Sequence, residues 1–148
     1  KFKNIIILNG HGGNRGVLEE VAASISNEKK VRILVTNWWS LTLDICNEVF
    51  GEDGGHAGNN ETAYIQAVFP EHVHPERFNQ NMAIPNPKSN AYMAVPVPSS
   101  ILLYTEGEGY PTFNQEQADI FYEKVNNRMI EVISDIIKKW DQARIYNN

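Results

Sequence analysis

The sequence predicts an α/β fold with a mainly parallel sheet, and three observations carry this prediction. Residues 5–8 are a largely β-branched run closed by Asn-Gly, which is typical of a strand buried on both faces. Residues 31–35 repeat this pattern and end at Thr-Asn. Between the two runs, apolar residues recur at helical spacing over residues 17–25. Strand, helix and strand with short connections predict a right-handed parallel crossover.

Two further helices are predicted downstream. The first covers residues 61–69, with Asn59 or Asn60 as its N-cap and Pro70 as its stop. The second covers residues 115–140 and is the longest helical stretch of the chain. Its apolar stripe consists of Ile120, Phe121, Val125, Met129, Val132, Ile133, Ile136 and Ile137.

Residues 75–111, the proline-rich segment, contain six of the seven prolines and show little periodicity. A stretch of this length is usually a functional loop or a subunit-contact arm. Its apolar side chains are Phe78, Met82, Ile84, Tyr92, Met93, Val95, Val97 and those of residues 101–104. An irregular segment cannot easily bury so much apolar surface inside one small domain, because its backbone polar groups also need partners. We therefore expect a homo-oligomer in which this segment forms the interface and closes over the site.

Composition places the chain among globular proteins and excludes several partners. Its 148 residues are near the commonest size of one domain, and 42% of them are hydrophobic and 21% charged. The net charge of −5 argues against nucleic acid or an anionic membrane surface as the main partner. No apolar run approaches the ~20 residues that a membrane span needs. The single cysteine, Cys46, allows no internal disulfide, so a cytoplasmic location is expected.

We expect one α/β domain over residues 1–148 that lacks its N-terminal segment. The chain begins at Lys1 without a methionine and enters a strongly apolar strand within a few residues, as an internal point of a larger protein would. The sequence contains no internal repeat and no low-complexity tract.

Three polar segments are candidates for the ligand-binding edge of the sheet. In an α/β sheet, ligands bind outside the carboxyl ends of the strands. NGHGGN, with His11, follows the first strand, and TNWWS, with Trp39, follows the second. GEDGGHAGNNET is a Gly-rich loop that runs into a helix, and it contains His56, Asp53 and Glu61. These segments predict a small-molecule site at this edge.

Each of these segments also has a purely structural interpretation. A tight turn would explain the glycines around His11, and Trp38-Trp39 would serve equally well in a core. Two histidines that are each embedded in a Gly-rich loop nevertheless favour a ligand or catalytic role. His72 and His74 form an H-x-H pair that can chelate a metal, but a solvated turn explains them more simply. The sequence has no G-x-G-x-x-G spacing, no P-loop lysine and no G-x-S-x-G.

Two motifs resemble the signature pair of the creatininase (creatinine amidohydrolase) family. They are ILNGHGGN and GGHAGNNETA, and ILVTNWW lies between them, where that family has a strand ending in an aromatic site residue. The resemblance covers residues 5–69 closely and the last helix more loosely. It implies a three-layer α/β/α fold with a mainly parallel sheet. It also implies a metal-dependent amidohydrolase that acts on small cyclic amides, formamides or related C–N bonds.

The resemblance further implies a divalent-metal site, commonly with two zinc, manganese or iron ions, and an oligomer, often a hexamer. His11 matches the metal-ligand histidine of the first motif, and His56 matches the catalytic histidine of the second. Glu61 matches the carboxylate that binds metal or steers that histidine. The positions expected to contact substrate are Gly12, Asn14, Trp39 and Asp53. Asn9 and Asn14 are expected to hold the first loop by side-chain hydrogen bonds.

The chain departs from creatininase itself at two positions. Creatininase has a metal-binding glutamate two residues after the first histidine, where this chain has Gly13, and a glutamate before the second histidine, where it has Gly55. Both departures argue against creatinine as the substrate. The family's E-x-H-G segment, which supplies further ligands including a bridging aspartate, has no match here.

The mechanism that follows is metal-assisted hydrolysis of an amide or formamide. A metal-activated water attacks the carbon, and His56 protonates the leaving nitrogen. Two alternatives stay open. One is a non-catalytic α/β module that grips a small ligand through backbone N–H groups, and the other is a doubly wound nucleotide-binding enzyme without metal.

Overall fold

The computed structural model describes residues 2–86 and 94–146, in two compact units. The first unit combines Lys1–Leu41 with Asn126–Asn148, and the second is Thr42–Val125. Tyr92 and Met93, two apolar residues of the proline-rich segment, lie outside the described residues. The expectation of a single domain that lacks an N-terminal segment stays a prediction. Within the described ranges, no helix has both the length and the apolar character of a membrane span.

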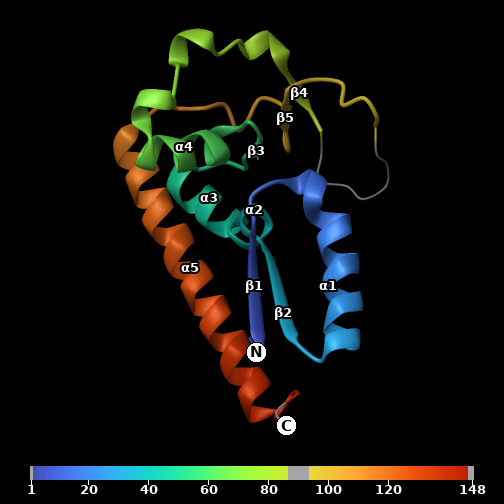
Figure 1. Cartoon of the computed structure of the whole chain (residues 1–148). Helices are drawn as coiled ribbons and strands as arrows, with labels where there is room; N and C mark the ends of the chain where they lie inside the picture. Colours follow the sequence, from blue (N-terminus) through green and yellow to red (C-terminus); the bar gives the residue numbers. More distant parts are fainter. Residues whose placement is uncertain (1, 87–93, 147–148) are drawn as a thin grey trace. The chain divides into compact units, whose positions relative to one another are not determined.

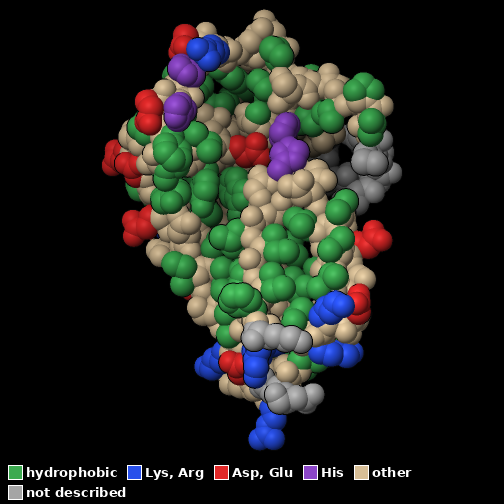
Figure 2. All heavy atoms as spheres, viewed as in Figure 1, with side chains coloured by type: hydrophobic (Ala, Val, Ile, Leu, Met, Phe, Trp, Pro, Cys, Tyr) green, Lys and Arg blue, Asp and Glu red, His purple; other side chains and the backbone are tan. Residues whose placement is uncertain are grey.

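A parallel pair of strands forms the sheet of the first unit, as the sequence predicts. Strands β1 (Asn4–Asn9) and β2 (Arg32–Asn37) pair in register from Asn4↔Arg32 to Asn9↔Asn37. Helix α1 (Arg15–Lys29) connects them and lies alongside the two strands (Figure 1). Apolar side chains gather over the strands and α1 on the face in Figure 2. The exposed large apolar side chains of β1 and α1 are Ile5, Leu8, Val17 and Val21.

The long C-terminal helix α5 (Gln115–Gln142) contributes to both units, because its first residues belong to the second unit and the rest to the first. Its predicted apolar stripe is confirmed where Phe121 and Val125 are fully buried, but Ile120 is exposed. In the first unit, Arg32 Nη1 donates to Asp141 Oδ1 at 2.6 Å. The α/β fold class is thus confirmed, with α1 on one side of the β1–β2 pair and residues 126–142 of α5 on the other (Figure 1).

Two short helices follow β2. Helix α2 (Trp38–Leu41) begins directly at the end of the strand. In the second unit, α3 (Leu43–Phe50), which the sequence analysis did not predict, buries Ile45 and Cys46. Cys46 is a buried thiol.

The second unit contains a three-stranded mixed sheet in the order β3-β5-β4. Strand β3 (Gly55–His56) is antiparallel to β5 (Ile101–Leu103), and β4 (Ala83–Pro85) is parallel to β5. The interpretation of residues 75–111 as an irregular segment is therefore wrong where β4 and β5 form. Two strands and the 3₁₀ turns η3 (Pro75–Arg77) and η4 (Gln80–Met82) lie within it. Ile101 and Leu103 bury their side chains inside the unit.

Helix α4 (Asn59–Val68) is present, but its predicted cap is wrong. The N-cap is Gly58, and Asn59 and Asn60 are the first two helical residues. Both asparagines are buried, and Asn60 Oδ1 accepts a hydrogen bond from Gly55 N at 3.0 Å. The buried backbone of the Gly-rich loop needs this acceptor, so the amide binds the loop instead of capping the helix. Pro70 then opens the 3₁₀ turn η2 (Pro70–His72).

Gly55→Ala is expected to lower the free energy of unfolding by about 3 kcal/mol, at the upper end of overpacking costs. A Cβ at this position would lie 2.4 Å from Leu102 O and 2.8 Å from Leu103 Cα, and both are backbone atoms that cannot rotate away. The control is Gly16→Ala in α1, where no atom lies within 4 Å of the added Cβ, so stability should be unchanged or higher by up to ~1 kcal/mol. Urea unfolding monitors both variants, and equal midpoints would contradict the tight β3–β5 contact.

Candidate functional site

His11 and Trp39 lie just beyond the carboxyl ends of β1 and β2, respectively. Asn9 and Asn37 are the last paired residues, and Asn9 Nδ2 donates to Asn37 Oδ1 at 2.7 Å. His11 and Trp39 each follow two residues later. The predicted edge of the sheet therefore exists in the first unit, with an imidazole and an indole beyond it.

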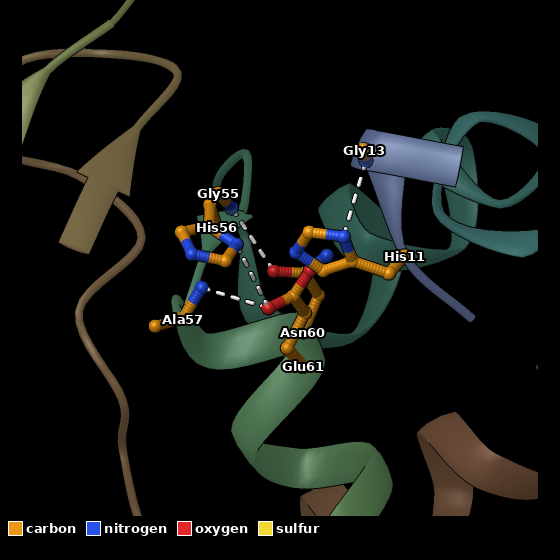
Figure 3. A network of polar contacts seen from close by, with 7 residues as sticks. All are labelled: His11, Gly13, Gly55, His56, Ala57, Asn60 and Glu61. Carbon is orange, nitrogen blue, oxygen red and sulfur yellow. Dashed lines mark hydrogen bonds and ion pairs between the residues drawn. The ribbon is translucent and has the colours of Figure 1, made fainter. Parts of the chain in front are cut away.

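The loop that carries His11 is held as the sequence predicts. Asn9 Oδ1 accepts hydrogen bonds from His11 N at 3.2 Å and from Asn14 Nδ2 at 3.3 Å. Residues Gly12–Asn14 form the 3₁₀ turn η1, and Gly13 N donates to His11 Nδ1 at 3.1 Å (Figure 3). A Cβ at Gly13 would lie only 3.1 Å from the same Nδ1 atom, so this glycine is needed for close approach to the imidazole.

Trp39 lies against the same loop. A Cβ at Gly12 would meet Trp39 Cζ2 at 3.8 Å, an ordinary van der Waals contact. The Trp38 ring packs edge-on against Trp39, with their centroids 6.3 Å apart, and both rings are half-buried. An aromatic wall beside the His11 loop is thus present in the first unit.

Glu61 organises the second predicted motif. Its Oε2 accepts a hydrogen bond from Ala57 N at 2.8 Å and lies 3.7 Å from His56 Nδ1 (Figure 3). Ala57 has φ of 53°, in the left-handed region that residues other than glycine seldom adopt. The Glu61 carboxylate therefore stabilises the unfavourable backbone conformation of Ala57. The Nδ1 atom of His56 faces the same carboxylate. The structure brings these two predicted catalytic residues together within the second unit.

The two acids of the Gly-rich loop are bound by asparagines. Asn47 Nδ2 donates to Asp53 Oδ1 at 2.6 Å, and Asn59 Nδ2 donates to Glu52 Oε1 at 3.4 Å. One carboxylate oxygen of Asp53 thus has a structural partner on α3. Its expected contact with substrate stays a prediction.

Tyr104 is a site neighbour that sequence reasoning missed. It follows β5, and its N–H donates to Gly54 O at 3.1 Å. Burial raises the pKa of its hydroxyl to about 12, and electrostatic interactions with Glu61, Cys46 and Asp53 raise it further. Like any tyrosine at neutral pH, Tyr104 carries its hydroxyl proton, and it can be a hydrogen-bond donor near the Glu61 and Asp53 carboxylates. A single tyrosine after a three-residue strand carries no sequence signal that would have found it.

A cavity of about 410 Å³ lies in the second unit. Glu61 and Ala57 line it, together with His72, His74 and Arg77 from the turns that follow α4. His72 and His74 are exposed turn residues, as the simpler interpretation of the H-x-H pair predicts, yet they also line this cavity. Sequence reasoning missed Arg77, Phe78 and Phe113, because no motif connects residues 77–78 or residue 113 with Glu61.

His11 and Glu61 are donor types that zinc, manganese and iron accept. In a metal-bound neutral imidazole, one nitrogen holds the metal and the other carries the proton. Neither ring nitrogen can then accept a hydrogen bond from Gly13 N. Metal binding at His11 therefore breaks this exposed hydrogen bond. The chemistry of each side chain, taken in its own unit, therefore suits a metal, with this one hydrogen bond lost at His11. Within residues 2–86 and 94–146, no group of three or more His, Cys, Asp or Glu side chains is arranged to hold an ion.

Comparisons with known proteins show the fold and, separately, the family. A crystal structure of creatinine amidohydrolase (creatininase) matches 90% of this chain with a TM-score of 0.63 and 19% sequence identity, which shows a shared fold. The chain spans 56% of that structure's length. No curated protein matches the chain. The sequence profile of the family described as creatinine amidohydrolase matches residues 1–133. The chain therefore belongs to the creatininase family.

Proposed function

We propose that this protein hydrolyses a C–N bond of a small cyclic amide or formamide, with His56 as the proton donor to the leaving nitrogen. The observation that carries the proposal is the position of Glu61, whose Oε2 is anchored by Ala57 N at 2.8 Å and lies 3.7 Å from His56 Nδ1. With Nδ1 turned toward the carboxylate, the opposite ring nitrogen, Nε2, is the atom that delivers the proton. Histidine is the side chain that enzymes use most often for such transfers.

The backbone supports this arrangement independently of the two side chains. His56 pairs with Leu102 in the β3–β5 ladder, and Glu61 lies in the first turn of α4, where the helix dipole favours an acid. The acid and the imidazole are thus each fixed by secondary structure. The exposed fraction of the His56 side chain is 43%, so the ring is accessible to a substrate.

His11 in the first unit and Glu61 in the second are each a residue that would bind a divalent ion, and we expect two ions of zinc, manganese or iron. When bound, such an ion polarises the amide carbonyl and makes water a nucleophile at neutral pH. In this proposal the chain presents the His11 ring on a loop that Asn9 holds by a hydrogen bond. Trp39 and Gly12 form a wall beside the substrate.

Two glycines support a substrate other than creatinine. The glutamates of creatininase are replaced by Gly13 and Gly55. A Cβ at Gly13 would approach the His11 ring to 3.1 Å, and a Cβ at Gly55 would clash with the backbone of Leu102. A side chain at either position would thus require the neighbouring loop to move.

The proposed function is tested with a panel of cyclic amides and N-formyl compounds, offered to the protein loaded with zinc, manganese or iron. We expect metal-dependent hydrolysis of at least one compound and slow or no hydrolysis of creatinine. Binding without hydrolysis, with every metal, would favour the non-catalytic binding module instead.

Glu61→Gln is expected to lower kcat by ~10² or more while the protein stays folded. Glutamine retains an oxygen that can accept from Ala57 N, but it loses the charge beside His56. Glu48→Gln is the matched control, because Glu48 pairs with Lys124 at 3.0 Å on the surface. Kinetics with the best panel compound and thermal unfolding measure the effect. If the Glu61→Gln enzyme kept its full kcat, Glu61 would only stabilise the loop and would have no part in catalysis.

We also infer a homo-oligomer in a cytoplasmic setting. Within the described part of the proline-rich segment, Met82, Val95 and Val97 remain exposed by 46%, 81% and 57% of their surfaces. Contact with another subunit would cover them. Light scattering over a dilution series checks this, and a protein that stays monomeric and active at micromolar concentration would exclude the segment as an assembly element.

A further inference from the structure

The cavity of the second unit combines an acidic part, a basic part and apolar walls. Glu61 lines it from α4, and His72, His74 and Arg77 line it from the residues around η2 and η3. The apolar walls come from Ile65, Val73, Phe78, Ile101, Pro111 and Phe113. Its volume of about 410 Å³ is within the ~300–1,000 Å³ of small-molecule sites.

Arg77 is the group of this basic part that carries a permanent positive charge, and it has an acidic neighbour. Arg77 Nε lies 3.7 Å from Glu76 Oε1, and the same oxygen lies 3.2 Å from His74 Nδ1. One carboxylate is thus shared by two basic groups. Figure 2 shows histidine, basic and acidic side chains gathered over these turns. A guanidinium presents its N–H groups as a planar fork that matches a carboxylate or a phosphate.

The aromatic wall is held in an unfavourable backbone conformation. Phe113 has φ of 52°, which is a genuine outlier for a bulky residue. Gln66 Nε2 donates to Phe113 O at 3.2 Å, and the Phe113 ring packs against Phe78 with centroids 5.9 Å apart. Ala57, at the Glu61 side of the cavity, also has a positive φ. Strained positions of this kind persist where surrounding contacts enforce them, and they cluster at binding sites.

We infer that the substrate carries an anionic group, a carboxylate or a phosphate, on an apolar planar body, and that Arg77 is the residue that selects it. This inference rests on the hydrolase function proposed above for the reacting end at Glu61. The anion binds at Arg77, the planar body lies against Phe78 and Phe113, and the C–N bond is directed toward Glu61. The negative charge of Glu61 disfavours the reverse orientation.

Binding is measured by calorimetry with benzoate, phenyl phosphate and neutral benzamide as probes. We expect at least one anion to bind ~10-fold or more tightly than benzamide. Arg77→Gln should weaken that anion by ~10- to 100-fold, the usual range for a charge-assisted hydrogen bond. Lys124→Gln, which removes one positive charge from the same unit but does not line the cavity, should change binding by less than about twofold. Whether benzoate or phenyl phosphate binds more tightly distinguishes a carboxylate from a phosphate.

Equal anion binding by the Arg77→Gln variant, or equal affinity for benzoate, phenyl phosphate and benzamide, would overturn the inference. With an anionic panel substrate, Arg77→Gln should raise KM and leave kcat within about twofold, whereas a neutral substrate should be unaffected. Arg77-dependent anion binding in a protein that hydrolyses nothing would uphold the cavity's selectivity and refute the proposed hydrolysis. Hydrolysis without Arg77-dependent anion binding would uphold the proposed hydrolysis and refute the role of Arg77 in selecting an anion.

Discussion

His56→Ala is expected to lower kcat by ~10²–10⁴, the usual contribution of a general acid or base, while bound metal stays at the level of the unchanged protein. The ring lies beside Glu61, and its removal deletes the proton donor but no predicted metal ligand. The fold should persist, because His56 pairs with Leu102 through its backbone in β3. Steady-state kinetics and elemental analysis of the same preparation measure both quantities.

Loss of metal from the His56→Ala protein would make His56 a ligand instead of a proton donor. His56→Gln separates shape from chemistry, because glutamine fills much of the space of the ring but cannot transfer a proton in the same way. It should be as impaired as the alanine variant. Recovery of kcat by His56→Gln would mean that the ring only positions other groups.

His11→Ala is expected to remove bound metal and activity together. The His11 ring is presented at the carboxyl end of β1 by a loop that Asn9 and Asn14 fix, so its loss leaves the rest of that loop in place. Arg15→Gln is the control, because Arg15 pairs with Glu19 on the surface of α1 and should leave metal content and kcat unchanged. Unchanged metal stoichiometry in His11→Ala would exclude His11 as a ligand.

Metal binding at His11 also has a structural readout that does not depend on turnover. The hydrogen bond from Gly13 N to His11 Nδ1 must be exchanged when the ring takes a metal. Titration with zinc should therefore shift the Gly13 amide resonance more than that of Gly16 in α1. Equal shifts of both amides would contradict binding through this ring.

Much of the first unit could be predicted because its signals are local. The apolar runs around Ile7 and Val35 are typical of buried strands, and the helix that connects them predicts a parallel pair. The hydrogen bonds of Asn9 and Asn14 could be predicted, since a short amide side chain reaches only nearby backbone and side-chain atoms. The second unit was harder, because β4 and β5 have three residues each, too few for a period to show.

The cap of α4 shows how tertiary contacts override a local rule. Asn59 and Asn60 have good N-cap chemistry, but Gly58 takes that position. Burial decides this, because Gly55 N needs a buried acceptor and Asn60 Oδ1 supplies it. Local propensity contributes about 1 kcal/mol at a cap, and an unsatisfied buried N–H costs at least as much.

The sequence by itself determined the α/β class, the strand-end position of His11 and the pairing of His56 with Glu61 in one motif, because each depends on residues within a few positions of one another. Only the tertiary structure decided which side chains share the cavity with Glu61. Arg77 and Phe113 lie 16 and 52 residues beyond Glu61 in the sequence, yet they line the same space. Their proximity results from chain folding between distant segments, and no local pattern of charge or hydropathy encodes it.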